Sequence, residues 1–198
     1  MGEVLDRSFF EQDVLTVAEK LIGAIFYYET YLDFFVAEIL ETEAYHEKDD
    51  PACHAYRGKT KRNEVMFGPP GHLYVYFTYG MHYCMNIVCE PEGVAAAVLL
   101  RSMRPISGIE SMQKNRGEKM KLKDLMRGPA RLTQAMGITT GQNGMPLDRN
   151  RKKPRAWIEL PTLHSHAVQK ATRIGISSGQ ELKWRFLAKD NPWVSRKG

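Results

Sequence analysis

Two glutamates and a tyrosine at alternate positions are the residues of this sequence best placed to do chemistry. Glu41, Glu43 and Tyr45 lie in the stretch Glu-Thr-Glu-Ala-Tyr. Alternate side chains of a β-strand share a face, so this stretch would line one surface with two carboxylates, their Cα atoms about 6.5 to 7 Å apart, and a phenol. Neighbouring carboxylates raise each other's proton affinity, which can separate acid and base roles. The pattern fits hydrolysis, including that of carbohydrate-cleaving pairs, although an isolated Glu-x-Glu is usually a solvated strand face.

A run rich in tyrosine lies further along the chain and ends at a glycine. Tyr74 and Tyr76 would share one strand face, and Tyr79 would fall at a turn with Gly80. An exposed aromatic ring at such a turn can enter the gap left by a nucleotide flipped out of duplex DNA. Stacking of this kind is worth roughly 1 to 3 kcal/mol per base. The alternative is that Tyr79 folds back onto its own hairpin. The opposite, core-facing side of the strand is predicted to carry Leu73, Val75 and Phe77.

Charge is distributed unevenly along the 198 residues, whose formal net charge is +5. Residues 1–50 carry 13 acidic and 3 basic side chains, a net charge of −10, whereas residues 51–198 carry 10 acidic and 25 basic ones, a net charge of +15. Such asymmetry can turn a positive face toward a polyanion. Taken alone, the basic stretches 114–123 and 149–155 read as solvated loops, but the whole pattern favours a nucleic-acid partner.

Several strands and a few helices must position these residues. Asp13 can cap a short helix that Gly23 ends, because apolar residues follow Asp13 at helical spacing. Residues 46–71 are polar and rich in turn formers, which predicts a long surface loop carrying His54. Strands are predicted at 24–28, 34–45, 72–78, 82–90, 94–103, 155–160, 171–174 and 184–187, and a helix is predicted to begin at Gly128-Pro129 and to end at Gly137.

Short connections between the early strands exclude parallel crossovers. The sequence therefore predicts an α+β fold with a curved antiparallel β-sheet, flanking helices and a protruding β-hairpin. The chain length and the lack of a linker predict one domain over residues 1–198.

Metals, cofactors and membranes are not expected to take part. Cys53, Cys84 and Cys89 are too few and too irregular for a disulfide framework, and no Cys-x-x-Cys pair suggests zinc. No apolar run reaches bilayer-spanning length, and the first residues lack the pattern of a secretory signal. We expect a monomer that is cytoplasmic and nucleoid-associated in a bacterium, or nuclear in a eukaryote.

Ten blocks of the sequence, spread in order over nearly the whole chain, resemble the alkyladenine (3-methyladenine) DNA glycosylase family and its bacterial-type members. These blocks are Glu-Thr-Glu-Ala-Tyr (41–45), His54, Arg-Asn (62–63), Met-Phe (66–67), Pro-Gly-His-Leu-Tyr-Val-Tyr (70–76), Tyr-Gly-Met (79–81), Cys-Met-Asn-Ile (84–87), Leu-Leu-Arg (99–101), Gly-Pro (128–129) and Asn-Pro-Trp-Val-Ser (191–195). The resemblance implies a monofunctional enzyme that cuts the N-glycosidic bond of alkylated purines, such as 3-methyladenine and 7-methylguanine, in duplex DNA. Deaminated and etheno purines are further candidate substrates, and water is the co-substrate.

The resemblance also implies roles for individual residues. Glu43 matches the carboxylate that activates the attacking water, Arg101 matches an arginine that holds this water, and a backbone carbonyl near Ala188 matches its third partner. Tyr45, His54 and Tyr76 correspond to the walls of the base pocket, Asn86 to an amide that disfavours the amino group of guanine, and Tyr79 to the intercalating finger, with Met81 beside it. No lysine occupies a matched pocket position, so a Schiff base is not expected.

Two alternatives use the same residues differently. A non-catalytic nucleic-acid module would bind DNA with strong salt dependence and release no base, although the presence of both Glu43 and Arg101 argues against it. A carbohydrate hydrolase would use Glu41 and Glu43 as its acid and base, which would leave the basic stretches and the tyrosine finger without a purpose.

Overall fold

The computed structural model describes residues 2–162 and 166–196, and within them nine strands form one antiparallel sheet. The strands are β1 (Glu3–Val4), β2 (Ile25–Glu29), β3 (Phe34–His46), β4 (Leu73–Thr78), β5 (His82–Val88), β6 (Ala96–Ser107), β7 (Arg155–Leu160), β8 (Val168–Ala171) and β9 (Arg185–Ala188). The helices are α1 (Arg7–Phe10), α2 (Val14–Lys20), α3 (Ile109–Arg116) and α4 (Pro129–Met136), with 3₁₀ turns at η1 (Glu64–Phe67), η2 (Leu122–Asp124) and η3 (Thr140–Gln142).

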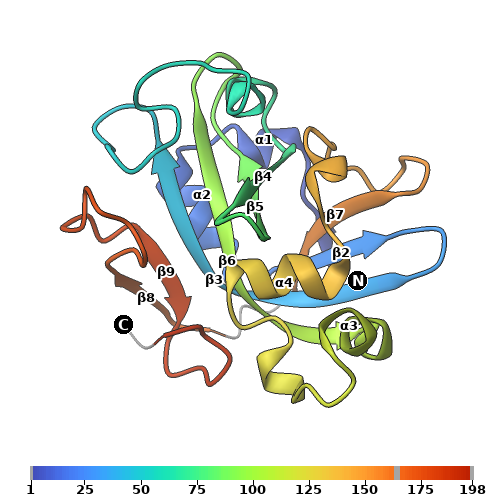
Figure 1. Ribbon diagram of the computed structural model, residues 1–198. Helices are drawn as coiled ribbons and strands as arrows, with labels where there is room; N and C mark the ends of the chain where they lie inside the picture. The colour runs from blue at the N-terminus through green and yellow to red at the C-terminus, as the bar shows by residue number, and fades with distance from the viewer. Residues whose placement is uncertain (1, 163–165, 197–198) are drawn as a thin grey trace.

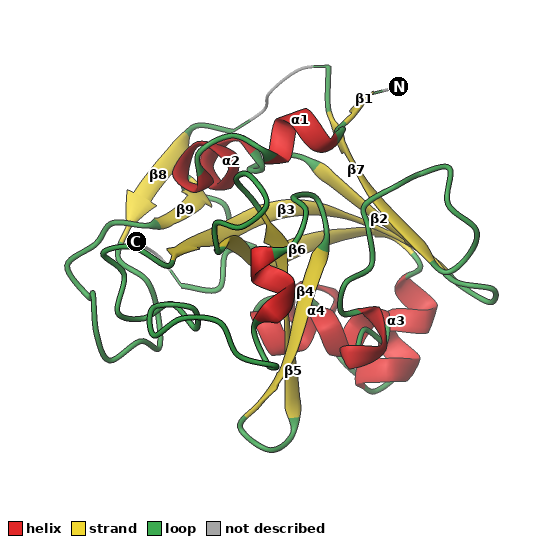
Figure 2. Ribbon diagram, turned by 90° about the horizontal axis from the view of Figure 1, so that it is seen from above, coloured by secondary structure: helices red, strands yellow, loops and turns green. Residues whose placement is uncertain are grey.

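The sheet runs in the order β1-β7-β2-β3-β6-β5-β4, and β9 pairs with both β3 and β8. Figure 1 shows α2 behind β3 and α4 in front of β6, so helices cover both faces near the centre of the sheet. Figure 2 shows the β4–β5 hairpin projecting away from the body. The predicted α+β class is confirmed, with its open antiparallel sheet, flanking helices and protruding hairpin.

The central strand β3 is buried along most of its length because it changes partner halfway. Its first part pairs with β2, its second part pairs with β9, and β6 accompanies it on the other side. The change of partner coincides with register shifts between Ile39 and Glu41 and between Glu41 and Thr42. Such irregularities re-aim side chains locally. Glu41 and Glu43 therefore lie where three strands meet.

Helix α2 fixes β3 from behind. The side chain of Asp13 accepts hydrogen bonds from the amides of Leu15 and Thr16, as an N-cap should. One turn later Ala18 packs in the core, and its carbonyl accepts a 2.8 Å hydrogen bond from the Thr42 hydroxyl. Thr42 points to this side of β3, so its neighbours Glu41 and Glu43 point to the other, as the alternation of a strand requires.

The hairpin turn places an aromatic residue at its tip. Thr78 pairs with His82, and the three residues between them include Tyr79 and Gly80, both in the left-handed region with φ of 51° and 68°. A non-glycine residue held there costs about 1 to 3 kcal/mol, a cost that recurs at functional sites. The ring of Tyr79 is 82 % exposed. It does not fold back on its own hairpin, so the alternative reading of this residue was wrong.

Some predicted details differ from the structure. Phe77 was predicted to enter the core with Leu73 and Val75, but it is 45 % exposed because the hairpin has left the body of the protein at that point. Strand β6 continues through Pro105 to Ser107. In this part it pairs only with β3, and the register of the pair shifts beside Pro105, whose nitrogen has no hydrogen to donate. The strand predicted at 171–174 lies three residues earlier, as β8.

Part of the charge asymmetry is neutralised by ion pairs inside the fold. Six carboxylates from the first fifty residues pair with arginine or lysine from beyond residue 100: Glu19, Glu29, Glu38, Glu41, Glu43 and Asp50. Strand β2 lies beside β7, and β3 lies beside β6 and β9, which accounts for many of these pairs. The asymmetry along the chain therefore reports strand pairing in part, and the external partner inferred from it stays a prediction. None of the helices among the described residues is long and apolar enough to cross a bilayer.

Candidate active site

Glu43 is a buried carboxylate with three donors around it. Its Oε2 accepts hydrogen bonds from Arg101 Nη1 at 3.2 Å and from the Tyr45 hydroxyl at 2.8 Å, and its Oε1 accepts one from the amide of Ile174 at 2.7 Å. A carboxylate offers about four acceptor positions, two on each oxygen. Within the described residues one position therefore stays open on Oε1, and a water molecule that donates to it would lie next to a base fixed from three sides.

Glu41 has a different environment from Glu43. It accepts four hydrogen bonds, from Arg101 Nε at 3.2 Å, from Arg185 Nη1 at 3.0 Å, and from the amide and hydroxyl of Ser195 at 2.6 and 2.9 Å. Three of these bonds end on Oε1 and one ends on Oε2. Of these donors only Arg101 lines the larger hollow, whereas all three donors of Glu43 line it. Glu41 thus orients Arg101 and ties down the segment around Ser195. This arrangement disfavours the carbohydrate hydrolase, which needs two working carboxylates.

Replacing Glu41 by glutamine is expected to destabilise the protein by about 3 to 5 kcal/mol, because Arg101 and Arg185 would lose a buried counter-charge. Equilibrium unfolding in urea measures this change. The matched control is Glu19→Gln, which breaks a 2.9 Å ion pair between exposed partners, Glu19 and Lys170, and should cost about 1 kcal/mol or less. Equal losses for the two variants would contradict the role given to Glu41.

Arg101 connects the carboxylates to an open cavity. Its guanidinium contacts both Glu41 and Glu43, and its side chain is only 8 % exposed. The exposed part lines a hollow of about 450 Å³, together with Leu99, Pro129 and Ile174. Strand β6 supplies Arg101 and the first residue of α4 supplies Pro129, so the sheet and a helix N-terminus meet at this hollow.

The four residues predicted to hold a base lie together. Tyr45, His54, Tyr76 and Asn86 all line a small inner hollow of about 20 Å³, and the first three also line the larger one. The inner hollow alone has room for about one water molecule, so a flat ring must extend into the larger one. His54 and Tyr76 meet edge to face with their ring centroids 4.5 Å apart.

The long loop that carries His54 is fixed by two polar contacts. His54 Nδ1 lies 3.0 Å from the Tyr74 hydroxyl, and its carbonyl accepts a hydrogen bond from the Asn63 side chain at 2.9 Å. Burial, and to a lesser degree the charge of Arg62, lowers the pKa of His54. The imidazole is therefore neutral at pH 7 and presents an uncharged ring to the hollow.

Tyr79 and Met81 lie at the tip of the hairpin. Tyr79 lines the larger hollow, whereas Met81 lines a separate groove between the hairpin and α4. Both residues are exposed. Their contact with DNA stays a prediction.

The backbone group that contacts Glu43 is the amide of Ile174, whose side chain lines the larger hollow. This amide donates to the carboxylate, whereas the group expected near Ala188 is a carbonyl that accepts from the attacking water. Ala188 is fully buried in β9, pairs with Val168 and lines neither hollow. The carbonyl partner of the water therefore stays a prediction.

The protonation of Glu43 sets the lower pH limit of any chemistry at this site. Burial raises the pKa of Glu43, and the charge of Arg101, the amide of Ile174 and the hydroxyl of Tyr45 all oppose that rise. A base works only when ionised, so activity should be lost as the pH falls through this raised pKa, above the value of an exposed glutamate.

Tyr45→Phe should move the acid limb of the rate profile to higher pH, because it removes one of the groups that lower the pKa of Glu43. Single-turnover rates measured across pH 4.5 to 8 test this. Tyr28→Phe is the control, since Tyr28 is a buried tyrosine of β2 that stacks on Phe35. An unchanged acid limb in the Tyr45 variant would show that the hydroxyl does not tune the base.

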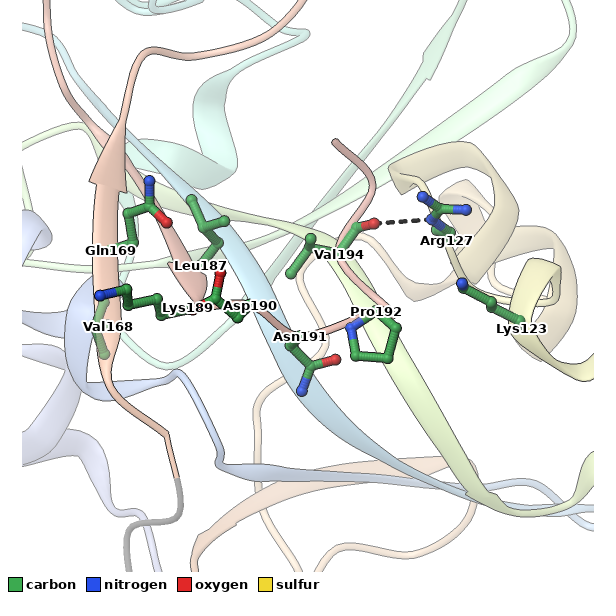
Figure 3. Close-up of a pocket in the computed structure, with 10 residues that line it drawn as sticks. All are labelled: Lys123, Arg127, Val168, Gln169, Leu187, Lys189, Asp190, Asn191, Pro192 and Val194. Atoms are coloured by element: carbon green, nitrogen blue, oxygen red, sulfur yellow. Dashed lines mark hydrogen bonds between the residues drawn. The ribbon is translucent and has the colours of Figure 1, made fainter. Parts of the chain in front are cut away.

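A larger cavity, of about 880 Å³, lies away from these residues. It is lined by segments of η2, β8 and β9 and by residues 189–192 and 194, and Arg127 Nε donates to the carbonyl of Val194 there at 2.8 Å (Figure 3). It holds neither an aromatic side chain nor any of the predicted site residues. Within the described residues no group of three or more histidine, cysteine, aspartate or glutamate side chains is arranged to hold a metal ion.

A buried carboxylate whose three donors line a hollow with several aromatic side chains is the arrangement that hydrolysis at a flat ring would need. The family model described as methylpurine-DNA glycosylase matches residues 8–192. The chain therefore belongs to the methylpurine-DNA glycosylase family, whose members are DNA glycosylases.

Curated relatives agree with this assignment. A protein of Carboxydothermus hydrogenoformans is 47 % identical over 194 residues, which cover 98 % of this chain and 100 % of the relative. One of Prosthecochloris aestuarii is 47 % identical over 197 residues, covering 99 % and 92 %, and one of Burkholderia lata is 45 % identical over 194 residues, covering 98 % and 92 %. All three carry the provisional name 3-methyladenine DNA glycosylase.

Proposed function

We propose that this protein excises alkylated purines, 3-methyladenine and 7-methylguanine among them, from duplex DNA by flipping the damaged nucleotide into the hollow between Tyr45, His54 and Tyr76. The observation that carries this proposal is that the buried carboxylate of Glu43 accepts hydrogen bonds from Arg101, Tyr45 and Ile174, all three of which line the larger hollow. Membership of the methylpurine-DNA glycosylase family also supports this proposal.

The reaction needs little beyond a positioned water molecule. An alkylated purine carries a positive charge, which makes it a good leaving group and a favourable guest for tyrosine faces. Glu43 accepts a proton from the water as the oxygen of that water attacks the sugar carbon, and the electrons of the broken N-glycosidic bond neutralise the departing base. General-base assistance of this kind is worth about 10² to 10⁴ in rate. The products are the free base and an abasic site in an uncut strand.

The hollow has no group suited to further cleavage of the strand. Among the described residues that line the two adjoining hollows there is no lysine. A Schiff base with the abasic sugar therefore has no amine to form it, and we infer that the enzyme is monofunctional. Neutral lesions such as hypoxanthine and ethenoadenine are proposed as additional, slower substrates, because their departure lacks the help of a positive charge.

Incubation with duplexes that each carry one lesion tests the proposal. The lesions are 7-methylguanine, hypoxanthine and ethenoadenine, with an undamaged duplex as the control, and chromatography of the supernatant detects freed base. We expect release of 7-methylguanine and strand breaks only after alkaline treatment. Salt-dependent binding without release of any base would support the non-catalytic module instead.

A further inference from the structure

Arg173 places a buried positive charge directly behind the proposed base pocket. Its guanidinium carbon lies 4.7 Å from the centroid of the Tyr45 ring and 5.3 Å from that of Trp184, so the guanidinium is layered between the two rings. Arg173 is 5 % exposed and lines neither hollow. Tyr45, which lines both hollows, therefore lies in contact with the guanidinium as well as with the proposed base site.

A single carboxylate neutralises this charge. Arg173 Nη1 and Nη2 each donate to an oxygen of Asp50 at 2.6 Å, and both side chains are fully buried. A second hydrogen bond runs from Nη1 to the carbonyl of Ala44 at 3.0 Å. This two-pronged geometry is the strongest form of carboxylate recognition by arginine.

Charges around the site are balanced in number. Three buried carboxylates, those of Glu41, Glu43 and Asp50, are matched by three buried guanidinium groups, those of Arg101, Arg173 and Arg185. Glu41 bonds to Arg101 and Arg185, Glu43 to Arg101, and Asp50 to Arg173. These buried charges thus cancel in number, while Arg62 adds a cation outside this set, with its guanidinium carbon 5.6 Å from the centroid of the Tyr76 ring.

We propose that Asp50 is a specificity-determining residue: by neutralising Arg173 behind Tyr45, it allows the pocket to accept cationic lesions. Without Asp50, the guanidinium would repel a cationic base through the ring and weaken the attraction between that base and the tyrosine face. A neutral base would feel little of this repulsion. Asp50 touches no substrate and acts through Arg173 and Tyr45. The inference rests on the proposed function, since it assumes that the base stacks on Tyr45.

Asp50 also has a structural role, which the test must separate. Its Oδ1 accepts a 3.1 Å hydrogen bond from the amide of Ala52, whose side chain lines both hollows. Damage to this loop would slow excision of every lesion, cationic or neutral. The decisive quantity is therefore the ratio of kcat/KM for 7-methylguanine to kcat/KM for ethenoadenine, measured in the same duplex context. General effects on folding and on affinity for the DNA backbone cancel in this ratio.

Asp50→Asn should lower the ratio about tenfold, which corresponds to ~1.4 kcal/mol. The double variant Asp50→Asn, Arg173→Met removes both charges and should bring the ratio back to within about twofold of the unmodified protein. Arg173→Lys keeps the charge beside Asp50 and should also leave the ratio nearly unchanged, whatever its effect on overall rate. Glu38→Gln controls for removal of a different buried carboxylate from the same region.

The inference would be overturned if Asp50→Asn slowed both lesions in parallel, or if the double variant kept the lowered ratio. Because Asp50→Asn can compromise folding, the double variant and Arg173→Lys, which leave no unpaired charge, keep the test decisive. The unmodified protein separates the two proposals: if it released neither lesion, the proposed function would fail, whereas release of both with an unchanged ratio in Asp50→Asn would refute only the role of Asp50.

Discussion

Glu43→Gln is expected to slow release of 7-methylguanine from duplex DNA by 10² to 10⁴, while binding of the same duplex changes by no more than a few fold. Glutamine has the shape of glutamate but cannot accept a proton, so the general-base contribution is lost. The amide also cannot satisfy both Arg101 and the amide of Ile174, so one buried donor would lose its partner, at a cost of about 1 to 3 kcal/mol.

Two measurements on the Glu43 variant are needed together. Single-turnover excision gives the rate, and a gel-shift titration gives the affinity for the lesion duplex. Glu38→Gln is the matched control, because Glu38 is also a buried carboxylate of β3 that pairs with an arginine, Arg104, at 2.7 Å, but this arginine lines neither hollow, whereas Arg101 lines the larger one. Excision by the Glu43 variant within tenfold of the unmodified rate would mean that another group activates the water.

Tyr79→Ala is the second change with a large expected effect. Loss of a ring that fills the space of the flipped nucleotide should weaken capture of a lesion in duplex DNA by 1 to 3 kcal/mol, or about 5-fold to 150-fold. Excision of the same lesion from a single strand should change little, since no stacked gap has to be filled there. Tyr79→Phe keeps the ring and should behave like the unmodified protein.

The fold offers a close control for the finger. Tyr31, on the turn between β2 and β3, is 78 % exposed, nearly as much as Tyr79 at 82 %. Tyr31→Ala removes an equally exposed ring from a different turn, so it tests whether any exposed tyrosine matters. If the Tyr79 variant lost duplex and single-strand activity equally, or if the Tyr31 variant matched it, Tyr79 would not be the intercalating residue.

The sequence was most informative where local rules govern the structure. The cap at Asp13, the proline start of α4 and the turn at Gly80 each depend on a few neighbouring residues, and all three are present. The alternation of side chains along a strand also placed Glu41 and Glu43 on one face correctly. These features follow from dihedral preferences and the period of two, which need no knowledge of the rest of the fold.

Local rules of this kind could not predict the contacts between distant segments. Asp50 and Arg173 are 123 positions apart, and nothing near either residue marks it as a partner of the other. For the same reason the sequence did not predict the contact between the amide of Ile174 and Glu43. It also did not predict the different partners of the two glutamates, because the donors to Glu41 come from β6, β9 and Ser195.

The contacts of Glu41 and Glu43 also have a consequence for the timing of synthesis. The two carboxylates are made early, but the groups that hold them in place, Arg101, Ile174, Arg185 and Ser195, emerge from the ribosome later. Until residue 195 has left the ribosome, Glu41 lacks two of its four donors. The contacts that hold the two carboxylates are therefore complete only after residue 195 has left the ribosome.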